Sequence, residues 1–200
     1  MSYTYPLKLH FKLLALAPRV SITDANGQEI LYVEQKVLAL KEAVKVFDNS
    51  TDKNLLYTMQ ANQIIDFGAK YIFNNAKTNT VIGSIQQEGM RSLVQASYTV
   101  HDTHDQPTYK IVQANPLISL LDSVLSIIPF AELLTGFILN PQYSVMKEGF
   151  EKPLLIMKKK PSFFEASFEI THDNEKIESK DELLLMLSLI MVVQLEKNRG

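Results

Sequence analysis

Two short segments carry the side chains best suited to chemistry. The run His101-Asp102-Thr103-His104-Asp105 places two imidazoles and two carboxylates within five residues, and metal ions use such groups as ligands. The same composition is typical of a solvated hairpin turn, which is the interpretation we favour. We therefore predict no metal site, no cofactor and no catalytic residues, and we expect a protein that is not an enzyme.

The second segment is the lysine triplet that ends an apolar stretch near residue 160. Alternation along a strand puts Lys158 and Lys160 on one face and Lys159 on the other. Anionic phospholipid headgroups could bind such lysines, since each basic residue near an anionic membrane contributes about 1 kcal/mol. The alternative, favoured by the usual role of surface charges, is a charged strand end that resists edge pairing. A lipid-binding patch would need further lysines from nearby strands, and the candidates are Lys8, Lys12, Lys41 or Lys45.

Length and composition bound the class of protein. The 200 residues predict a single domain over 1–200, and 46% hydrophobic with 21% charged residues is ordinary globular usage. The net charge is -2, and neither half is basic enough to indicate nucleic acid as a partner. The absence of cysteine excludes a disulfide framework. Charged residues interrupt the N-terminal apolar stretch, so we expect no signal peptide and a cytoplasmic location.

A strand pattern extends from about residue 5 to residue 115. Leu7, Leu9 and Phe11 alternate with polar residues, which is the period of two of a half-buried strand. The turn Asp24-Ala25-Asn26-Gly27 is typical of a hairpin. The regular spacing of strands and turns favours a sandwich or a barrel. Further strands are predicted at 19–23, 28–36, 40–47, 54–60, 69–74, 79–86, 94–101, 107–113, 143–147, 152–159 and 163–171.

The pattern changes to a helical one between residues 116 and 140. Polar residues recur at i, i+3, i+4 and i+7 in 117–128, and Pro129 can begin a second helix. This helical insertion could cap the fold or contact a protein partner, such as a second copy in a homodimer. The apolar stripe that would make this contact consists of Phe130, Leu133, Leu134, Phe137 and Ile138.

The C-terminal segment is apolar on every face. The 13 residues from Leu183 to Leu195 are too few for a bilayer span, which needs roughly 20, so we expect no transmembrane span. A helix that is apolar all round must be buried on all sides, and a closed barrel has room for one. Ser179 and Glu182 fit a capping box at its start. The sequence thus predicts about a dozen strands around a buried helix over 182–195.

This arrangement resembles the tubby-like fold, a mainly β closed barrel of about twelve strands around a hydrophobic C-terminal helix. The chain is similar to the LURP-one-related branch of that superfamily, including its bacterial members. The resembling stretches are YPLKLHFKLLALAPRVSITDANGQEILYVEQKVLALKEAVKVFD and NPQYSVMKEGFEKPLLIMKKKPSFFEASFEI. The superfamily includes tubby proteins, which bind phosphoinositides, and phospholipid scramblases.

The resemblance implies a binding or regulatory module with no shared catalytic motif. Its first expected partner is an anionic phospholipid, which would place the protein at the periphery of a membrane. The alternative is a protein-interaction or self-associating module that uses the helical insertion. Vesicle binding at two salt concentrations separates the two hypotheses, because salt screens lysine contacts but not apolar ones.

Overall fold

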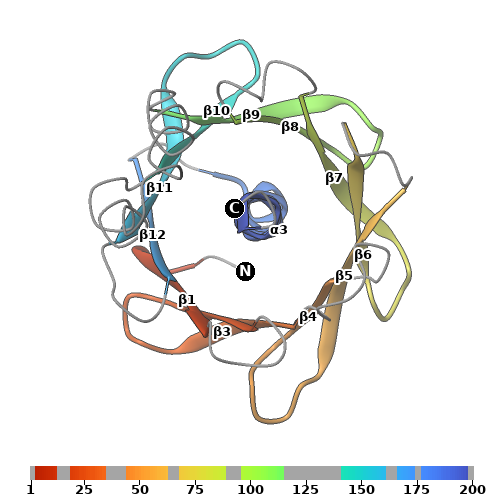
Figure 1. Ribbon diagram of the computed structural model, residues 1–200. Coiled ribbons are helices and arrows are strands. Elements are labelled where there is room, and N and C mark those ends of the chain that lie inside the picture. Colours follow the sequence, from red (N-terminus) through yellow and green to blue (C-terminus); the bar gives the residue numbers. More distant parts are fainter. Residues whose placement is uncertain are drawn as a thin grey trace, which may run out of the picture.

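Twelve antiparallel strands close into a barrel within the residues that the computed structural model describes. Each strand pairs with its neighbours in the chain, and β12 (Ala166–His172) pairs with β1 (Leu7–Lys12) to close the wall (Figure 1). The predicted mainly β closed barrel is thereby confirmed. The described residues are 3–12, 19–34, 44–62, 68–88, 96–114, 141–160, 166–173 and 177–197.

The remaining strands lie close to the positions that the sequence pattern predicts. Consecutive strands are joined in an up-and-down meander, so every pairing in the wall is antiparallel. Their bounds are β2 Arg19–Thr23, β3 Glu29–Glu34, β4 Val44–Phe47, β5 Leu55–Ala61, β6 Lys70–Asn75, β7 Val81–Gln87, β8 Ser97–His101, β9 Pro107–Gln113, β10 Gln142–Lys147 and β11 Pro153–Lys160.

The alternation along β1 shows how the sequence sets the two faces of the wall. Leu7, Leu9 and Phe11 are buried inside the barrel, whereas Lys8 between them is exposed on the outside. Successive side chains of a strand point to opposite faces, so a period of two separates core from surface. The same alternation of buried and less buried residues recurs along β2, β9 and β10, whose bounds are given above.

The turn at Asp24 is held by the side chain of that aspartate. Its Oδ1 accepts hydrogen bonds from the backbone amides of Asn26 and Gln28, both at 2.9 Å. Gly27 has a φ of 80°, a conformation that glycine adopts without steric cost. The predicted hairpin between β2 and β3 is therefore confirmed.

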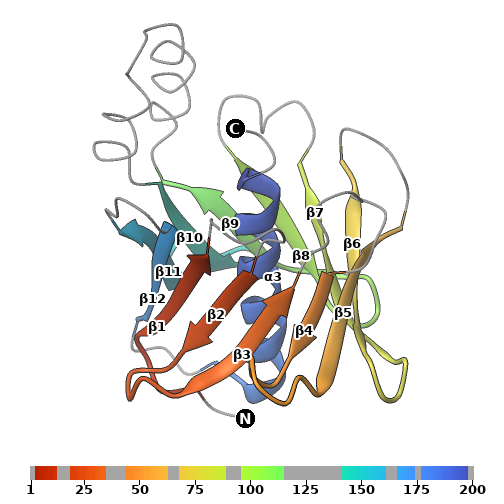
Figure 2. The ribbon, with the colours of Figure 1, turned by 60° about the horizontal axis from the view of Figure 1, so that its bottom comes forward.

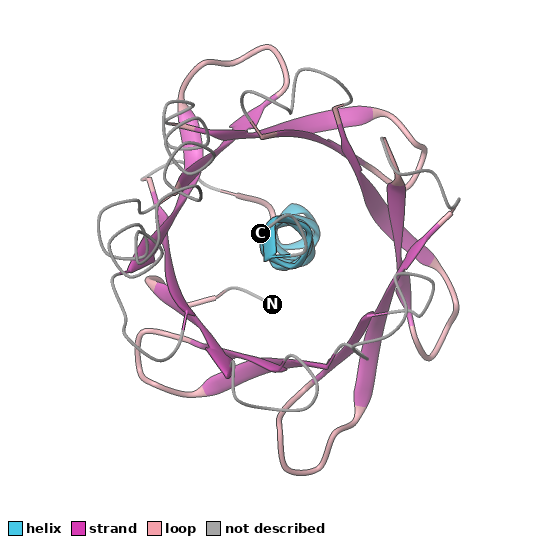
Figure 3. Cartoon of the chain, in the orientation of Figure 1, coloured by secondary structure: helices cyan, strands magenta, loops and turns pink. Residues whose placement is uncertain are grey.

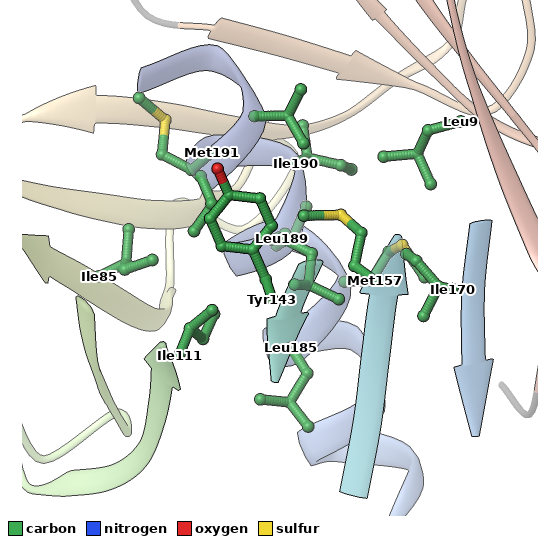
Figure 4. Close-up of a cluster of buried hydrophobic side chains, with 14 of the residues drawn as sticks. Leu9, Ile85, Ile111, Tyr143, Met157, Ile170, Leu185, Leu189, Ile190 and Met191 are labelled. Atoms are coloured by element: carbon green, nitrogen blue, oxygen red, sulfur yellow. The ribbon is translucent and has the colours of Figure 1, made fainter. Parts of the chain in front are cut away.

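The helix α3 (Ser179–Lys197) runs through the barrel along its axis. Figure 2 shows the helix between the walls, and Figure 3 shows it end-on inside the ring of strands. Every residue from Leu184 to Leu195 is buried. Figure 4 shows Leu185, Leu189 and Ile190 among side chains of the surrounding strands. The barrel thus covers all faces of the helix, as its apolar sequence predicts.

The helix passes closest to β7 and β8, and Gly83 makes this approach possible. A Cβ atom at position 83 would lie 2.5 Å from the backbone oxygen of His101 and 2.6 Å from Cδ1 of Leu184. Gly83 also has a φ of +155°. Any larger residue would push the helix or the neighbouring strand away.

Hydrogen bonds tie the first turn of α3 to the barrel. Asp181 accepts a hydrogen bond from the Tyr109 hydroxyl at 2.9 Å, and burial together with this carboxylate raises the pKa of Tyr109. Glu182 accepts the backbone amide of Tyr3 at 3.3 Å. The Glu182 carboxylate thus contacts the N-terminal segment. The backbone amide of Glu182 donates to the Glu178 carbonyl at 2.9 Å and is therefore not capped by Ser179, as the predicted capping box requires. Both acidic residues also suit the positive end of the helix dipole.

The predicted helical insertion at 116–140 lies outside the described residues. The same is true of its proposed contact residues Phe130, Leu133, Leu134, Phe137 and Ile138. Within the described part of the chain, no helix has the length and apolar character needed to cross a bilayer.

Candidate functional site: a lysine cluster on the barrel wall

The structure brings three of the predicted lysines together on the outer wall. Lys8 on β1 and Lys158 on β11 both lie opposite Glu169, which is on the intervening strand β12. Lys160 is two residues further along β11 and forms an ion pair with the same glutamate. We call Lys8, Lys158, Lys160 and Glu169 the lysine cluster.

Strand alternation explains why these four residues face outward. Met157 and Ile170, next to Lys158 and Glu169 in the chain, are fully buried inside the barrel. The three lysines are exposed and Glu169 is half-buried between them. Lys159 falls on the opposite face of β11, as the alternation predicts.

The charges of the cluster lie close enough to act together. Adjacent strands are about 4.8 Å apart, so the backbones of Lys8 and Lys158 are separated by roughly 10 Å. This distance is comparable to the Debye length of about 8 Å at physiological salt. The cluster holds three positive charges and one negative charge, and therefore carries a net charge of +2 by the formal charges of its four residues. The whole chain has a net charge of -2, so the net charge of the cluster is opposite in sign to that of the whole chain.

The ion pair within the cluster is a surface interaction. Nζ of Lys160 lies 2.7 Å from Oε1 of Glu169, and the two side chains are 46% and 26% exposed. Exposed pairs of this kind contribute about 0–1 kcal/mol to folding. Its main effect is therefore electrostatic: it neutralises one of the three lysines of the cluster.

Of the other predicted lysines, Lys45 lies away from this cluster. Lys45 is exposed on β4, three strands from β1, where it lies opposite Glu34. The Lys53 ammonium, 2.7 Å from Glu34, lowers the pKa of that carboxyl. The backbone of Lys12 pairs with Arg19 at the end of β1. Lys41 lies outside the described residues.

Acidic residues gather at the end of the barrel where α3 begins. Figure 2 shows the start of α3 at this end, together with the hairpin turns that join consecutive strands. The exposed lysines Lys77 and Lys147 are also found in these hairpins. The acidic residues of these turns and of the segments around the start of α3 are Asp24, Asp48, Asp52, Asp102, Asp105, Glu148, Glu151, Asp173, Glu178, Asp181 and Glu182. A negatively charged partner is therefore better accommodated by the wall of β11, β12 and β1 than by this end.

The His101–Asp105 segment is a hairpin turn, as its composition predicts. Oδ1 of Asp102 accepts the backbone amides of His104 at 2.8 Å and Gln106 at 2.9 Å. These hydrogen bonds stabilise the carboxylate and lower the pKa of Asp102. Asp105 pairs with Lys70. Within the described residues, no three His, Cys, Asp or Glu side chains are arranged to hold a metal ion.

Glu169 is the member of the cluster that the sequence did not reveal. Its outward orientation follows from the alternation of Ser167, Glu169 and Thr171 with buried residues in β12. Its position between Lys8 and Lys158 depends on the pairing of residues more than 150 positions apart, which alternation does not determine. Knowledge of the strand register would have identified it.

In comparisons with known proteins, no family model, no curated protein and no solved structure matches the chain.

Proposed function

We propose that the protein is a non-enzymatic binding module that contacts the anionic phospholipid headgroups of a membrane surface. The observation that carries this proposal is the lysine cluster. Three exposed lysines on β1 and β11 surround a single glutamate on the outer wall of the barrel. Lysine ammonium groups attract lipid phosphates mainly as point charges, which suits an exposed surface.

The size of the cluster indicates weak and reversible binding. Each basic residue near an anionic membrane contributes about 1 kcal/mol. Two net positive charges therefore give roughly 2 kcal/mol, which is enough to enrich the protein at a surface but not to anchor it permanently. The interaction depends on ionic strength because salt screens exposed charges.

Membership of the LURP-one-related family is part of the same proposal. A twelve-strand barrel around a C-terminal helix is the architecture that this resemblance implies. A cytoplasmic protein that associates peripherally with the membrane is consistent with both features.

The alternative function is protein interaction or self-association through the helical insertion. It depends on residues outside the described part of the chain, so no contact in the structure favours it. The sequence of its apolar stripe remains the reason for testing it.

Vesicle co-sedimentation tests the proposal. Wild-type protein is expected to sediment with phosphatidylserine-containing vesicles at low salt and to be released at high salt. It should not sediment with vesicles of phosphatidylcholine alone. The double variant Lys8→Gln/Lys158→Gln should lose most of this binding, because it removes the two positive charges on either side of Glu169.

A matched control removes two exposed lysines at the acidic end. Lys77→Gln/Lys147→Gln changes the net charge of the chain by the same amount and should bind vesicles like the wild type. Equal loss of binding in the two double variants would mean that net charge alone is responsible. Salt-insensitive binding or oligomerisation would favour the helical insertion.

A further inference from the structure

We infer that Glu169 is a built-in counter-charge that limits the affinity of the lysine cluster for an anionic membrane, an inference that rests on the proposed function. Glu169 lies directly opposite Lys8 and Lys158 in the strand register and forms an ion pair with Lys160. It thus lies beside all three lysines of the cluster and places one negative charge among them.

The pairing divides the three lysines into two roles. Lys160 holds the Glu169 carboxylate at 2.7 Å, so this pair presents little net charge to a membrane. Within the described part of the chain, the ion pair found in the cluster is the one between Lys160 and Glu169, and Lys8 and Lys158 are exposed. They are the lysines whose charge remains available for a lipid phosphate.

The structure around Glu169 supports an electrostatic rather than a structural role. Its side chain is on the outer surface, and its neighbours Phe168 and Ile170 supply the buried contacts of β12. A surface ion pair contributes about 0–1 kcal/mol to folding. The same charge among three lysines has a large effect on the cluster. Its removal raises the net formal charge of the cluster from +2 to +3 and so strengthens the attraction for anions.

The consequence is a membrane contact that responds to surface charge density. With the Glu169 side chain present, a sparse distribution of anionic lipids gives little binding, and enrichment of anionic lipid is needed. Without this charge, vesicles with a lower anionic fraction should be sufficient. Glu169 would thus set the lipid composition at which the protein associates.

Vesicle titration of Glu169→Gln tests this role. Its affinity for phosphatidylserine-containing vesicles should increase about fivefold over that of the wild type, the effect of one charge near an anionic surface. Lys160→Gln/Glu169→Gln removes the whole pair and should bind like the wild type. The thermal unfolding midpoint of each variant shows whether the fold is retained.

The matched control is Glu178→Gln. Glu178 is also an exposed glutamate in a lysine ion pair, at 3.1 Å from Lys180, but it lies at the acidic end of the barrel. This variant should bind vesicles like the wild type.

Unchanged binding of Glu169→Gln, or an equal increase in Glu178→Gln, would overturn the inference while leaving the proposed function intact. A wild-type protein that fails to bind anionic vesicles at low salt would overturn both.

Discussion

Replacing Gly83 with alanine tests the closest contact between the helix and the barrel wall. The new Cβ atom would lie 2.5 Å from the His101 carbonyl oxygen and 2.6 Å from Cδ1 of Leu184. Overpacking of this kind typically costs about 1–3 kcal/mol. The backbone φ of +155°, which alanine rarely adopts, adds about 1–3 kcal/mol. We therefore expect Gly83→Ala to lower the free energy of unfolding by about 2–6 kcal/mol.

Equilibrium unfolding in urea, followed by circular dichroism, measures this effect. Gly149→Ala is the matched control, because Gly149 has a φ of +81° but no atom within 4 Å of the position that a Cβ would take. It carries the backbone cost of about 1–2 kcal/mol without the steric one.

A second comparison separates the two contacts at Gly83. Leu184→Ala removes the Cδ1 atom, so Gly83→Ala/Leu184→Ala should destabilise the protein less than the sum of the single substitutions. A Gly83→Ala variant no less stable than Gly149→Ala would refute the close approach of α3 to β7.

The remaining predictions concern the buried helix and its first turn. Leu187→Asp or Ile190→Asp should prevent folding, because an unpaired charge inside the barrel costs several kcal/mol. Soluble variants with wild-type circular dichroism would contradict this. The control is Leu187→Met, which should lower the free energy of unfolding by less than about 1.5 kcal/mol. Tyr109→Phe should cost about 1 kcal/mol at neutral pH through loss of the hydrogen bond to Asp181. Because the folded-state pKa of Tyr109 is raised above 10.0, the stability that this tyrosine contributes is present below its unfolded pKa and is lost as the pH rises above that value. Urea unfolding should therefore be measured near neutral pH and above pH 10.0. Between these two conditions the free energy of unfolding should fall more for the wild type than for Tyr109→Phe. An equal fall in both proteins would contradict the role of the Tyr109 hydrogen bond.

The fold could be predicted because the local residue pattern of each element shows which of its faces must be buried. The alternation of Leu7, Leu9 and Phe11 with polar residues requires one buried face. The run from Leu184 to Leu195 requires burial on every face, and an enclosing wall is the most economical way to provide it. These two requirements lead to a barrel around a helix without knowledge of any pairing partner.

The site could be predicted only in part because it depends on register. Alternation places Lys158 and Lys160 on one face, but it does not determine which residue of β12 lies beside them. The position of Glu169 between Lys8 and Lys158 follows from the pairing of the consecutive strands β11 and β12 and from the long-range pairing of β12 with β1. The distance of Lys45 from the cluster, three strands around the wall from β1, likewise becomes evident only once the strand order is known.

Chemical footprinting of lysines on vesicles tests the central functional claim most directly. The protein is acetylated in solution and on phosphatidylserine-containing vesicles at low salt, and the modification at each lysine is measured by mass spectrometry. Protection is predicted at Lys8 and Lys158, which are exposed on the wall of β1 and β11, whereas Lys77 and Lys147 at the acidic end should react equally in both states. Undiminished reactivity of Lys8 and Lys158 on bound vesicles, or protection of Lys77 and Lys147 instead, would contradict a membrane contact through the lysine cluster.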